Sequence, residues 1–244
     1  MQRQFYMSLP SNSSMDIYPD NTLTEYRVKL PERKILQRER EVGLASVTFP
    51  HTWFNIRSPT TNFLYDDGRG EWLGSAIPNG YYHSISDVTD AIMKEIKEAK
   101  QENSKIQFSF DTASERISVL LETMTKLWLS MDLGIMLGFG GEVTLTQSST
   151  TPQMSDISGV VQSLYIYSNI EDSQIVGDVR APLLRIVSAE GKYGTVITRN
   201  FDNPQYLPLA TKEFETVEVL IRDDMGRKVS LERGRAVIIL SFRL

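Results

Sequence analysis

The sequence predicts an all-β protein, a single jelly-roll β-sandwich with one or two short helices in its connections and long loops at its ends. Three observations support this prediction. Apolar and polar residues alternate in many short runs, turn residues separate these runs, and helical periodicity is found at only two places. Because no internal repeat and no linker rich in proline, glycine or serine divides the chain, we expect one jelly-roll domain over residues 1–244.

Most of the expected strands have one buried and one solvated face. The alternation of apolar and polar residues is found in the runs 5–9, 26–30, 106–110, 117–121 and 217–221. The third and fourth of these runs flank a short polar segment, which predicts a hairpin. After the last run, Gly226 marks a turn, and the final run AVIILSF is almost continuously apolar. This final run predicts a central strand that is buried on both faces.

Two segments have helical periodicity. In residues 86–100 the apolar side chains Val88, Ile92 and Ile96 fall on one side. They predict one amphipathic helix that lies across a sheet edge, with Ser86 as its N-cap. Residues 130–137 predict a second, shorter helix that ends at Gly138.

The segment VQSLYIYSNIEDSQIVGDVRAPLLRIV, residues 161–187, contains two apolar runs and a polar loop. The runs Val160–Tyr167 and Leu183–Val187 predict strands, and Asn169–Asp178 predicts their connection. Pro182 indicates an edge or the start of a strand, because proline cannot donate to the ladder. The charged side chains of this region are Glu171, Asp172, Asp178 and Arg180. We interpret them as residues that keep the connection solvated, rather than as an active site.

Two stretches, 50–84 and 188–212, have weak periodicity and predict long loops at the ends of the sandwich. Loops of such length usually have a function. Since large aromatic side chains dominate protein interfaces, we expect contacts with a partner in the first stretch. The candidate interface residues are Trp53, Phe54, Trp72, Tyr81 and Tyr82.

The composition of the 244 residues argues against several classes of protein. The absence of cysteine removes disulfides, thiolate nucleophiles and cysteine-ligated zinc, and favours a protein that is made in a reducing compartment and is not secreted. The net charge of −5 and the absence of lysine or arginine blocks argue against nucleic-acid binding through a basic surface. No window approaches the roughly 20 apolar residues of a membrane span, and the N-terminal run lacks the apolar core of a signal peptide.

The sequence contains no motif for catalysis. The two histidines, His51 and His83, lie far apart, and His51 is interpreted as a packed, hydrogen-bonded residue. There is no G-x-S-x-G elbow, and the glycines of MLGFGG are not followed by the Lys-Ser/Thr of a phosphate loop. The acidic pairs Asp66-Asp67 and Asp223-Asp224 are each followed by glycine, which predicts solvated turns. We therefore expect no enzyme activity, no cofactor and no metal.

Two alternatives stay open. A carbohydrate- or receptor-binding jelly roll would stack aromatic rings at loop tips, such as Trp53 and Trp72, on sugar rings. A β-sandwich enzyme with a site built from distant residues would show titratable groups that converge in a deep pocket.

Four segments carry a resemblance to a known family. They are FYMSLPSNSSMDIYPDNTLTEYRVKLPERKIL, EVGLASVTFPHTWFNI, IMLGF and the segment 161–187, and in this order they extend over nearly the whole chain. Together they resemble the minor capsid (penton) proteins of Polinton/Maverick elements and adintoviruses. The resemblance implies a single jelly roll that forms homopentamers at the fivefold vertices of an icosahedral capsid. It also implies a larger double jelly-roll major capsid protein as partner, and a place in the virion after synthesis in the cytoplasm or nucleus of a host cell.

Overall fold

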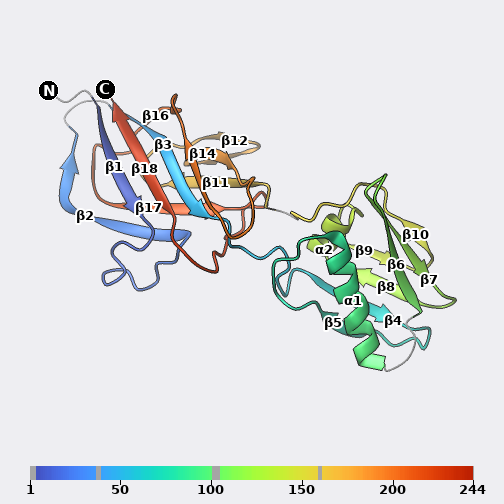
Figure 1. Cartoon of the computed structure of the whole chain (residues 1–244). Helices are drawn as coiled ribbons and strands as arrows, with labels where there is room; N and C mark the ends of the chain where they lie inside the picture. The colour runs from blue at the N-terminus through green and yellow to red at the C-terminus, as the bar shows by residue number, and fades with distance from the viewer. Residues whose placement is uncertain (1–3, 37–39, 101–104, 159–160, 244) are drawn as a thin grey trace. The chain divides into compact units, whose positions relative to one another are not determined.

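The chain folds into two compact units, as a computed structural model shows for residues 4–36, 40–100, 105–158 and 161–243 (Figure 1). Unit 1 consists of Met1–Trp53 and Val161–Leu244, and unit 2 consists of Phe54–Val160. Each unit has its own cluster of buried apolar side chains. This division differs from the prediction of one domain over residues 1–244. Its physical reason is that the inserted segment has enough apolar side chains to bury a core of its own.

Unit 1 is built from two antiparallel sheets. Sheet A has the strand order β1 (Gln4–Pro10), β18 (Val237–Arg243), β3 (Glu41–Pro50) and β15 (Val196–Asn200), and β16 (Leu207–Pro208) also pairs with β3. Sheet B has the order β14 (Leu183–Ser188), β11 (Ser163–Ser168), β17 (Glu213–Arg222) and β2 (Glu25–Ile35). The short hairpin of β12 (Gln174–Val176) and β13 (Val179–Ala181) lies in the connection from β11 to β14.

The strand order is that of a jelly roll. If the main strands of the two sheets are numbered along the described part of unit 1, sheet A reads 1-8-3-6 and sheet B reads 2-7-4-5. Consecutive strands therefore lie in opposite sheets, except the fourth and fifth, β11 and β14, which are neighbours in sheet B. This order is the double Greek key of the jelly roll. The predicted fold class, an all-β jelly-roll sandwich, is confirmed.

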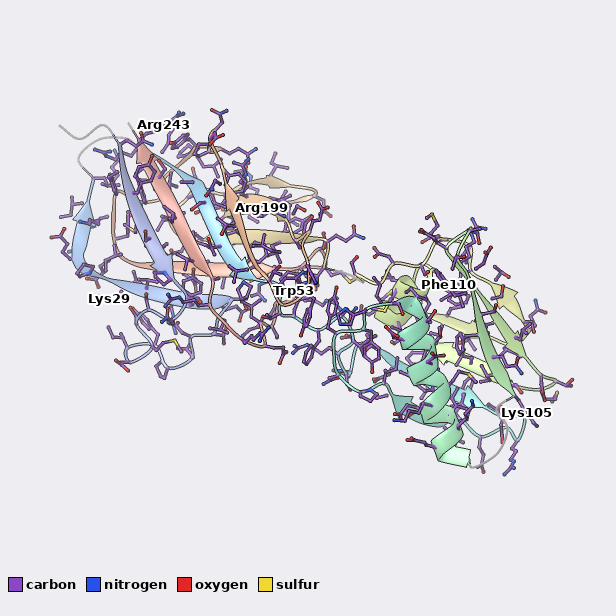
Figure 2. The ribbon with its side chains drawn as sticks, in the orientation of Figure 1. Lys29, Trp53, Lys105, Phe110, Arg199 and Arg243 are labelled. Atoms are coloured by element: carbon purple, nitrogen blue, oxygen red, sulfur yellow. The ribbon has the colours of Figure 1, made fainter. Side chains whose placement is uncertain are left out.

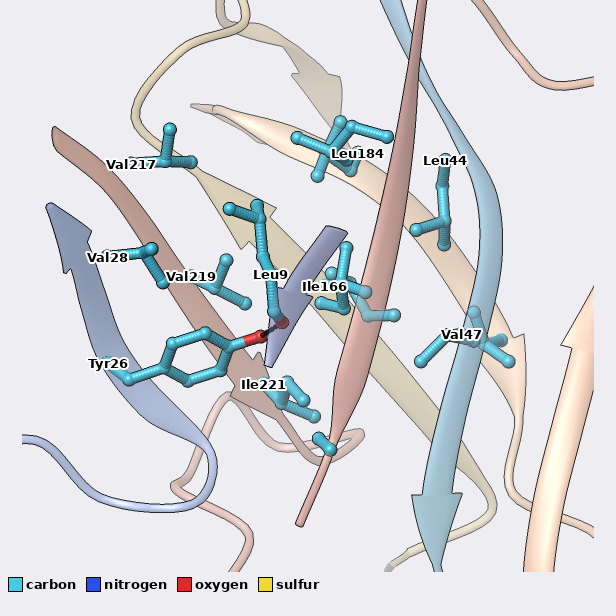
Figure 3. Packing of buried hydrophobic residues seen from close by; sticks show 14 of the residues in the cluster. Leu9, Tyr26, Val28, Leu44, Val47, Ile166, Leu184, Val217, Val219 and Ile221 are labelled. Carbon is cyan, nitrogen blue, oxygen red and sulfur yellow. Dashed lines mark hydrogen bonds between the residues drawn. The ribbon is translucent and has the colours of Figure 1, made fainter. Parts of the chain in front are cut away.

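The core of unit 1 forms where the alternating strands turn their apolar sides toward each other. Figure 3 shows side chains of β1, β2, β3, β11 and β17 in this cluster. Tyr26 of sheet B donates a hydrogen bond of 2.9 Å from its hydroxyl to the carbonyl oxygen of Leu9 in sheet A. Because the phenol has a partner, its burial leaves no polar group unsatisfied. The predicted alternation in the runs 5–9, 26–30 and 217–221 agrees with the burial in these strands.

The C-terminal run is a central strand, as its composition predicts. β18 lies between β1 and β3, and Ile238, Leu240 and Phe242 are fully buried. Pro182 precedes β14, which is an edge strand of sheet B, so the interpretation of this proline also agrees with the structure. β11 begins at Ser163, and Val160, where the prediction placed its start, lies outside the described residues.

Unit 2 has two small sheets and both helices of the described chain. One sheet has the order β5 (Leu73–Ala76), β4 (Asn62–Asp66), β8 (Lys126–Leu129) and β9 (Val143–Leu145). The other has the order β10 (Ser149–Thr150), β7 (Arg116–Leu121) and β6 (Ile106–Asp111). The helices are α1 (Ile85–Lys100) and α2 (Met131–Leu137). As predicted, α1 lies against sheet edges, since it contacts the edge strands β5 and β6.

The two predicted long loops contain short strands. Stretch 50–84 includes β4 and β5, and stretch 188–212 includes β15 and β16. Their partners are distant in sequence, because β4 pairs with β8 and β15 pairs with β3. Tertiary pairing therefore makes strands of segments that are too short to show a clear period.

The helix ends show one correction and one agreement. Ser84, not Ser86, caps α1, because its hydroxyl accepts the N–H of Asp87 at 3.1 Å while the Asp87 carboxylate accepts the N–H of Ser84 at 3.0 Å. At the end of α2, Gly138 has the left-handed φ of 95° that the sequence predicts for a terminating glycine.

Candidate interaction surfaces

Trp53, the first predicted interface residue, is a core residue of unit 1. Its side chain, labelled in Figure 2, is only 4% exposed. Its ring stacks on His51 with the ring centroids 4.1 Å apart. The His51 Nδ1 lies 3.0 Å from the carbonyl oxygen of Gly191, and burial lowers the pKa of this histidine. The prediction of Trp53 as an exposed anchor is therefore corrected, because its indole fills the sandwich. His51 is the packed, hydrogen-bonded residue that the sequence indicates.

The other four candidates lie in unit 2. Phe54, Tyr81 and Tyr82 are half-buried, and the bridge between Ile56 and Gly80 brings their two segments side by side. Asn55 fixes this arrangement: its amide nitrogen donates to the carbonyl oxygen of Tyr82 and its amide oxygen accepts the N–H of Tyr82, both at 2.9 Å. The segment that contains Phe54 therefore lies beside the segment that contains Tyr81 and Tyr82.

Trp72 lies in unit 2, immediately before β5. It is 44% exposed and neighbours the exposed Leu73, while Met124 on the turn between β7 and β8 is 71% exposed. A Cβ on Gly68 would lie 3.2 Å from the Cβ of Met124, so the β4–β5 loop and this turn are in contact.

Asp66 holds the loop that carries Trp72. Its Oδ1 accepts the N–H groups of Gly68 at 2.9 Å and Gly70 at 3.0 Å, and the Lys126 Nζ lies 3.5 Å from its Oδ2. Burial favours the neutral acid, but these hydrogen bonds and the lysine charge outweigh it and lower the pKa of Asp66. The pair Asp66-Asp67 forms the predicted turn. Asp66, however, is buried rather than solvated, because it satisfies the backbone of its own loop.

The second acidic pair is also structural. The buried Asp223 accepts the N–H of Met225 at 2.9 Å and of Arg227 at 2.8 Å, and the Arg227 Nε lies 3.0 Å from its other oxygen. Asp224 accepts the N–H groups of Gln162 at 2.7 Å and Ser163 at 3.0 Å. As with Asp66, the predicted turn is present, but the solvated reading of Asp223 is wrong because the turn encloses it.

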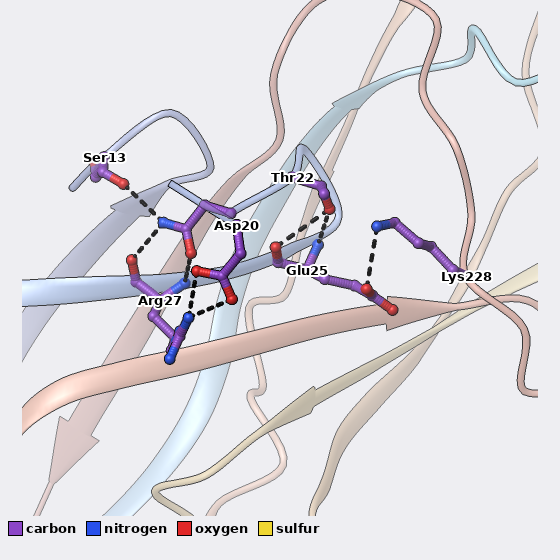
Figure 4. Close-up of polar contacts among 7 residues, drawn as sticks. Ser13, Asp20, Thr22, Glu25, Arg27 and Lys228 are labelled. Carbon is purple, nitrogen blue, oxygen red and sulfur yellow. Dashed lines mark hydrogen bonds and ion pairs between the residues drawn. The ribbon is translucent and has the colours of Figure 1, made fainter. Parts of the chain in front are cut away.

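Ion pairs connect the β1–β2 loop and the β17–β18 loop to strand β2 of sheet B (Figure 4). Asp20 pairs with Arg27 at 2.5 Å, and Glu25 pairs with Arg222 at 2.6 Å and with Lys228 at 3.1 Å. Such half-exposed pairs contribute little to stability individually, but here they fix a loop to its strand.

The charged residues of segment 161–187 have different environments. Asp172, Asp178 and Arg180 are exposed, whereas Glu171 is 2% exposed. One oxygen of Glu171 accepts the N–H of Ser168 at 3.1 Å, while the other oxygen and the Ser168 hydroxyl have no hydrogen-bond partner in the described chain. Burial raises the pKa of Glu171 to about 8. The solvated interpretation is therefore wrong for Glu171. Its burial depends on a bridge to the distant Leu209, which no local pattern indicates.

A groove of about 410 Å³ lies beside the β12–β13 hairpin. Its lining residues are Gln174, Ile175, Val176, Gly177, Leu183, Arg185, Ile186 and Gln205, and we name it the hairpin groove. The Arg185 guanidinium carbon lies 3.8 Å from the ring centroid of Phe201, and its Nη1 donates to the carbonyl oxygen of Asn203 at 3.4 Å. Sequence reasoning missed this groove, because its walls come from a hairpin, an edge strand and a distant loop.

The described residues contain no group of three or more histidine or acidic side chains that could hold a metal ion. In the same part of the chain, neither helix has the length and apolar character needed to cross a lipid bilayer.

The fold defines the class of protein. It is a single jelly roll with a second compact unit inserted between its third and fourth main strands, β3 and β11.

Comparison with solved structures shows similar architectures. The crystal structure of the mavirus penton protein matches with a TM-score of 0.55 and 12% identity, over 99% of this chain and 99% of that chain. A chain from the cryo-EM structure of the Sputnik virophage matches with a TM-score of 0.48 and 12% identity, over 100% of this chain and 98% of that one. No protein-family model and no curated protein matches the sequence. At the level of the fold, the mavirus match bears out the predicted resemblance to penton proteins.

Proposed function

We propose that this chain is a penton-type minor capsid protein, which forms homopentamers at the fivefold vertices of an icosahedral capsid. The observation that carries the proposal is the match in fold to the mavirus penton protein, which extends over 99% of both chains and so includes the inserted unit. The role is structural and needs neither a catalytic site nor a cofactor. The partners are other copies of the chain and a double jelly-roll major capsid protein, and the protein resides in the virion after synthesis in the host cell.

The surface of unit 1 supports self-association. Each edge strand of the two sheets carries an exposed large apolar side chain: Tyr6 on β1, Val196 on β15, Ile35 on β2 and Ile186 on β14. A cyclic ring needs a heterologous interface, in which one surface of a copy contacts a different surface of the next. Apolar residues at both edges of a sheet are compatible with this requirement.

Light scattering on the purified protein tests the oligomer, and co-expression with the major capsid protein tests the vertex role. We expect light scattering to give five times the mass of the chain. We also expect the co-expressed pentamer to be incorporated into capsids. Ile35→Asp and Val196→Asp should each weaken pentamer formation about tenfold, since each places a charge in an apolar contact. Leu120→Asp, at an exposed position on β7 of unit 2, is the matched control. A chain that stays monomeric at high concentration and never joins the capsid would contradict the proposal.

A further inference from the structure

The hairpin groove contains a cation, the guanidinium of Arg185. Among the described residues, Arg185 has no carboxylate within ion-pair distance, and none of the groove's lining residues is acidic. Of its five N–H donors, only Nη1 makes a hydrogen bond within the described part of the chain, the 3.4 Å contact with Asn203. Phe201 covers one face of the guanidinium, so the edge of the planar group stays open to a ligand.

The partly buried environment of Arg185 favours the binding of a ligand that accepts hydrogen bonds. The side chain is half-buried, and burial lowers its pKa, although a guanidinium keeps its charge. A partly desolvated cation loses hydration that only an acceptor can replace. A carboxylate matches the fork of the guanidinium with two parallel hydrogen bonds, and a single arginine suits it better than a phosphate dianion, which several cations usually bind.

The walls of the groove indicate that the ligand has apolar groups in addition to a negative charge. Ile175 is 75% exposed, and Ile186 and Val176 present further apolar surface beside the arginine. The side-chain amide of Gln174 donates to the carbonyl oxygen of Leu183, which ties the hairpin to the edge strand β14. An apolar rim around one cation fits an acidic side chain with apolar neighbours.

We propose that the hairpin groove binds an extended segment of a neighbouring polypeptide, with an acidic side chain on Arg185 and apolar side chains on Ile175 and Ile186. The edge strand β14 forms one wall, and an extended segment is the conformation that lies along a strand edge. In such a segment residues two apart face the same side, so apolar residues at positions i−2 and i+2 accompany the acid at position i. The inference concerns this groove alone and does not depend on the vertex role.

Fluorescence anisotropy with an uncharged dye tests the proposal on the full-length protein, whatever its oligomeric state. The probe is acetyl-Thr-Ile-Thr-Glu-Thr-Ile-Thr-amide, and the same peptide with glutamine in place of glutamate is its control. We expect saturable binding of the glutamate peptide, and about tenfold weaker binding of the glutamine peptide, because a charge-assisted pair is lost. Arg185→Met should weaken binding by a similar factor. Arg180→Met, which removes an exposed arginine of the same hairpin outside the groove lining, should not.

A second variant keeps the test decisive if Arg185→Met fails to fold. Ile175→Asp places a negative charge at an exposed position on the rim, where it repels the glutamate of the peptide. This variant should also weaken binding about tenfold. Equal affinity for the two peptides, or the absence of any binding up to their solubility limit, would overturn the proposal. Displacement of the peptide by an equal concentration of sodium acetate would also overturn it, since the groove would then bind small carboxylates rather than a protein segment.

Discussion

The hydroxyl of Tyr26 donates to the carbonyl oxygen of Leu9, and this single bond of 2.9 Å joins the edge strands of the two sheets inside the jelly roll. Burial raises the pKa of Tyr26, so the phenol stays protonated and keeps donating as the solution becomes alkaline. The contact therefore joins the two sheets through a phenol that stays protonated at alkaline pH.

Replacement of Tyr26 by phenylalanine should destabilise unit 1. The ring still fits, but the buried carbonyl of Leu9 loses its side-chain donor, and we expect the free energy of unfolding to fall by about 1–2 kcal/mol. Urea denaturation followed by tyrosine and tryptophan fluorescence measures this change. Tyr6→Phe, at an exposed position, is the control and should have a smaller effect. Equal losses of unfolding free energy in the two variants would show that the buried hydrogen bond contributes no more to stability than the exposed hydroxyl.

Gly134 should tolerate no side chain. A Cβ at this position of α2 would lie 1.9 Å from the carbonyl oxygen of Gly141, a backbone atom that cannot move without shifting the loop. Gly134→Ala should therefore lower the stability of unit 2 by about 3 kcal/mol, and the melting temperature reports the loss. Gly80→Ala, whose Cβ would meet only the Tyr82 ring at 3.6 Å, should melt close to the unmodified protein.

The cap of α1 distinguishes two serines. Ser84→Ala removes the hydroxyl that accepts the N–H of Asp87, and should cost about 1 kcal/mol of unfolding free energy. The Ser86 hydroxyl makes no such bond with the helix end in the described chain, so Ser86→Ala should change stability by less than about 0.5 kcal/mol. Thermal unfolding of both variants decides the point, and a larger loss for Ser86→Ala would contradict the capping that we describe.

Glu171 should make the protein less stable as pH rises. In the unfolded chain its carboxyl ionises near 4.5, while burial keeps it protonated in the fold up to about pH 8. Between these values the folded state binds more protons, so the free energy of unfolding falls with rising pH, by at most about 1.4 kcal/mol per pH unit. Glu171→Gln should remove this slope, and so stabilise the protein at pH 8 more than at pH 5.

Urea denaturation at these two pH values measures the effect. Asp172→Asn changes the adjacent, exposed acid and should leave the slope in place. If the unmodified protein and Glu171→Gln showed parallel pH profiles, the buried carboxyl would not control the stability.

Local patterns predicted most strands of unit 1, because residues such as Val217 and Val219 alternate with polar neighbours along strands that each have one buried face. The second unit was missed, since it is inserted directly after Trp53 without a linker of distinctive composition. Of the candidate surface residues, the sequence could not separate the buried Trp53 from the exposed Trp72. The Trp53 ring packs with Phe49 and His51 of its own segment, but its burial depends on a core assembled from strands that are distant in sequence.

The insertion of unit 2 also sets the order in which the protein can fold during synthesis. Unit 2 is one continuous stretch, but the strands of unit 1 come from both sides of it. β18, which pairs with both β1 and β3, follows every other strand in chain order. The first three strands therefore leave the ribosome more than a hundred residues before β11. Their apolar faces stay exposed to solvent until the strands of the other half of unit 1 are synthesised. The jelly roll can close only after β18 has been synthesised, and the insertion lengthens that interval by the time needed to translate residues 54–160.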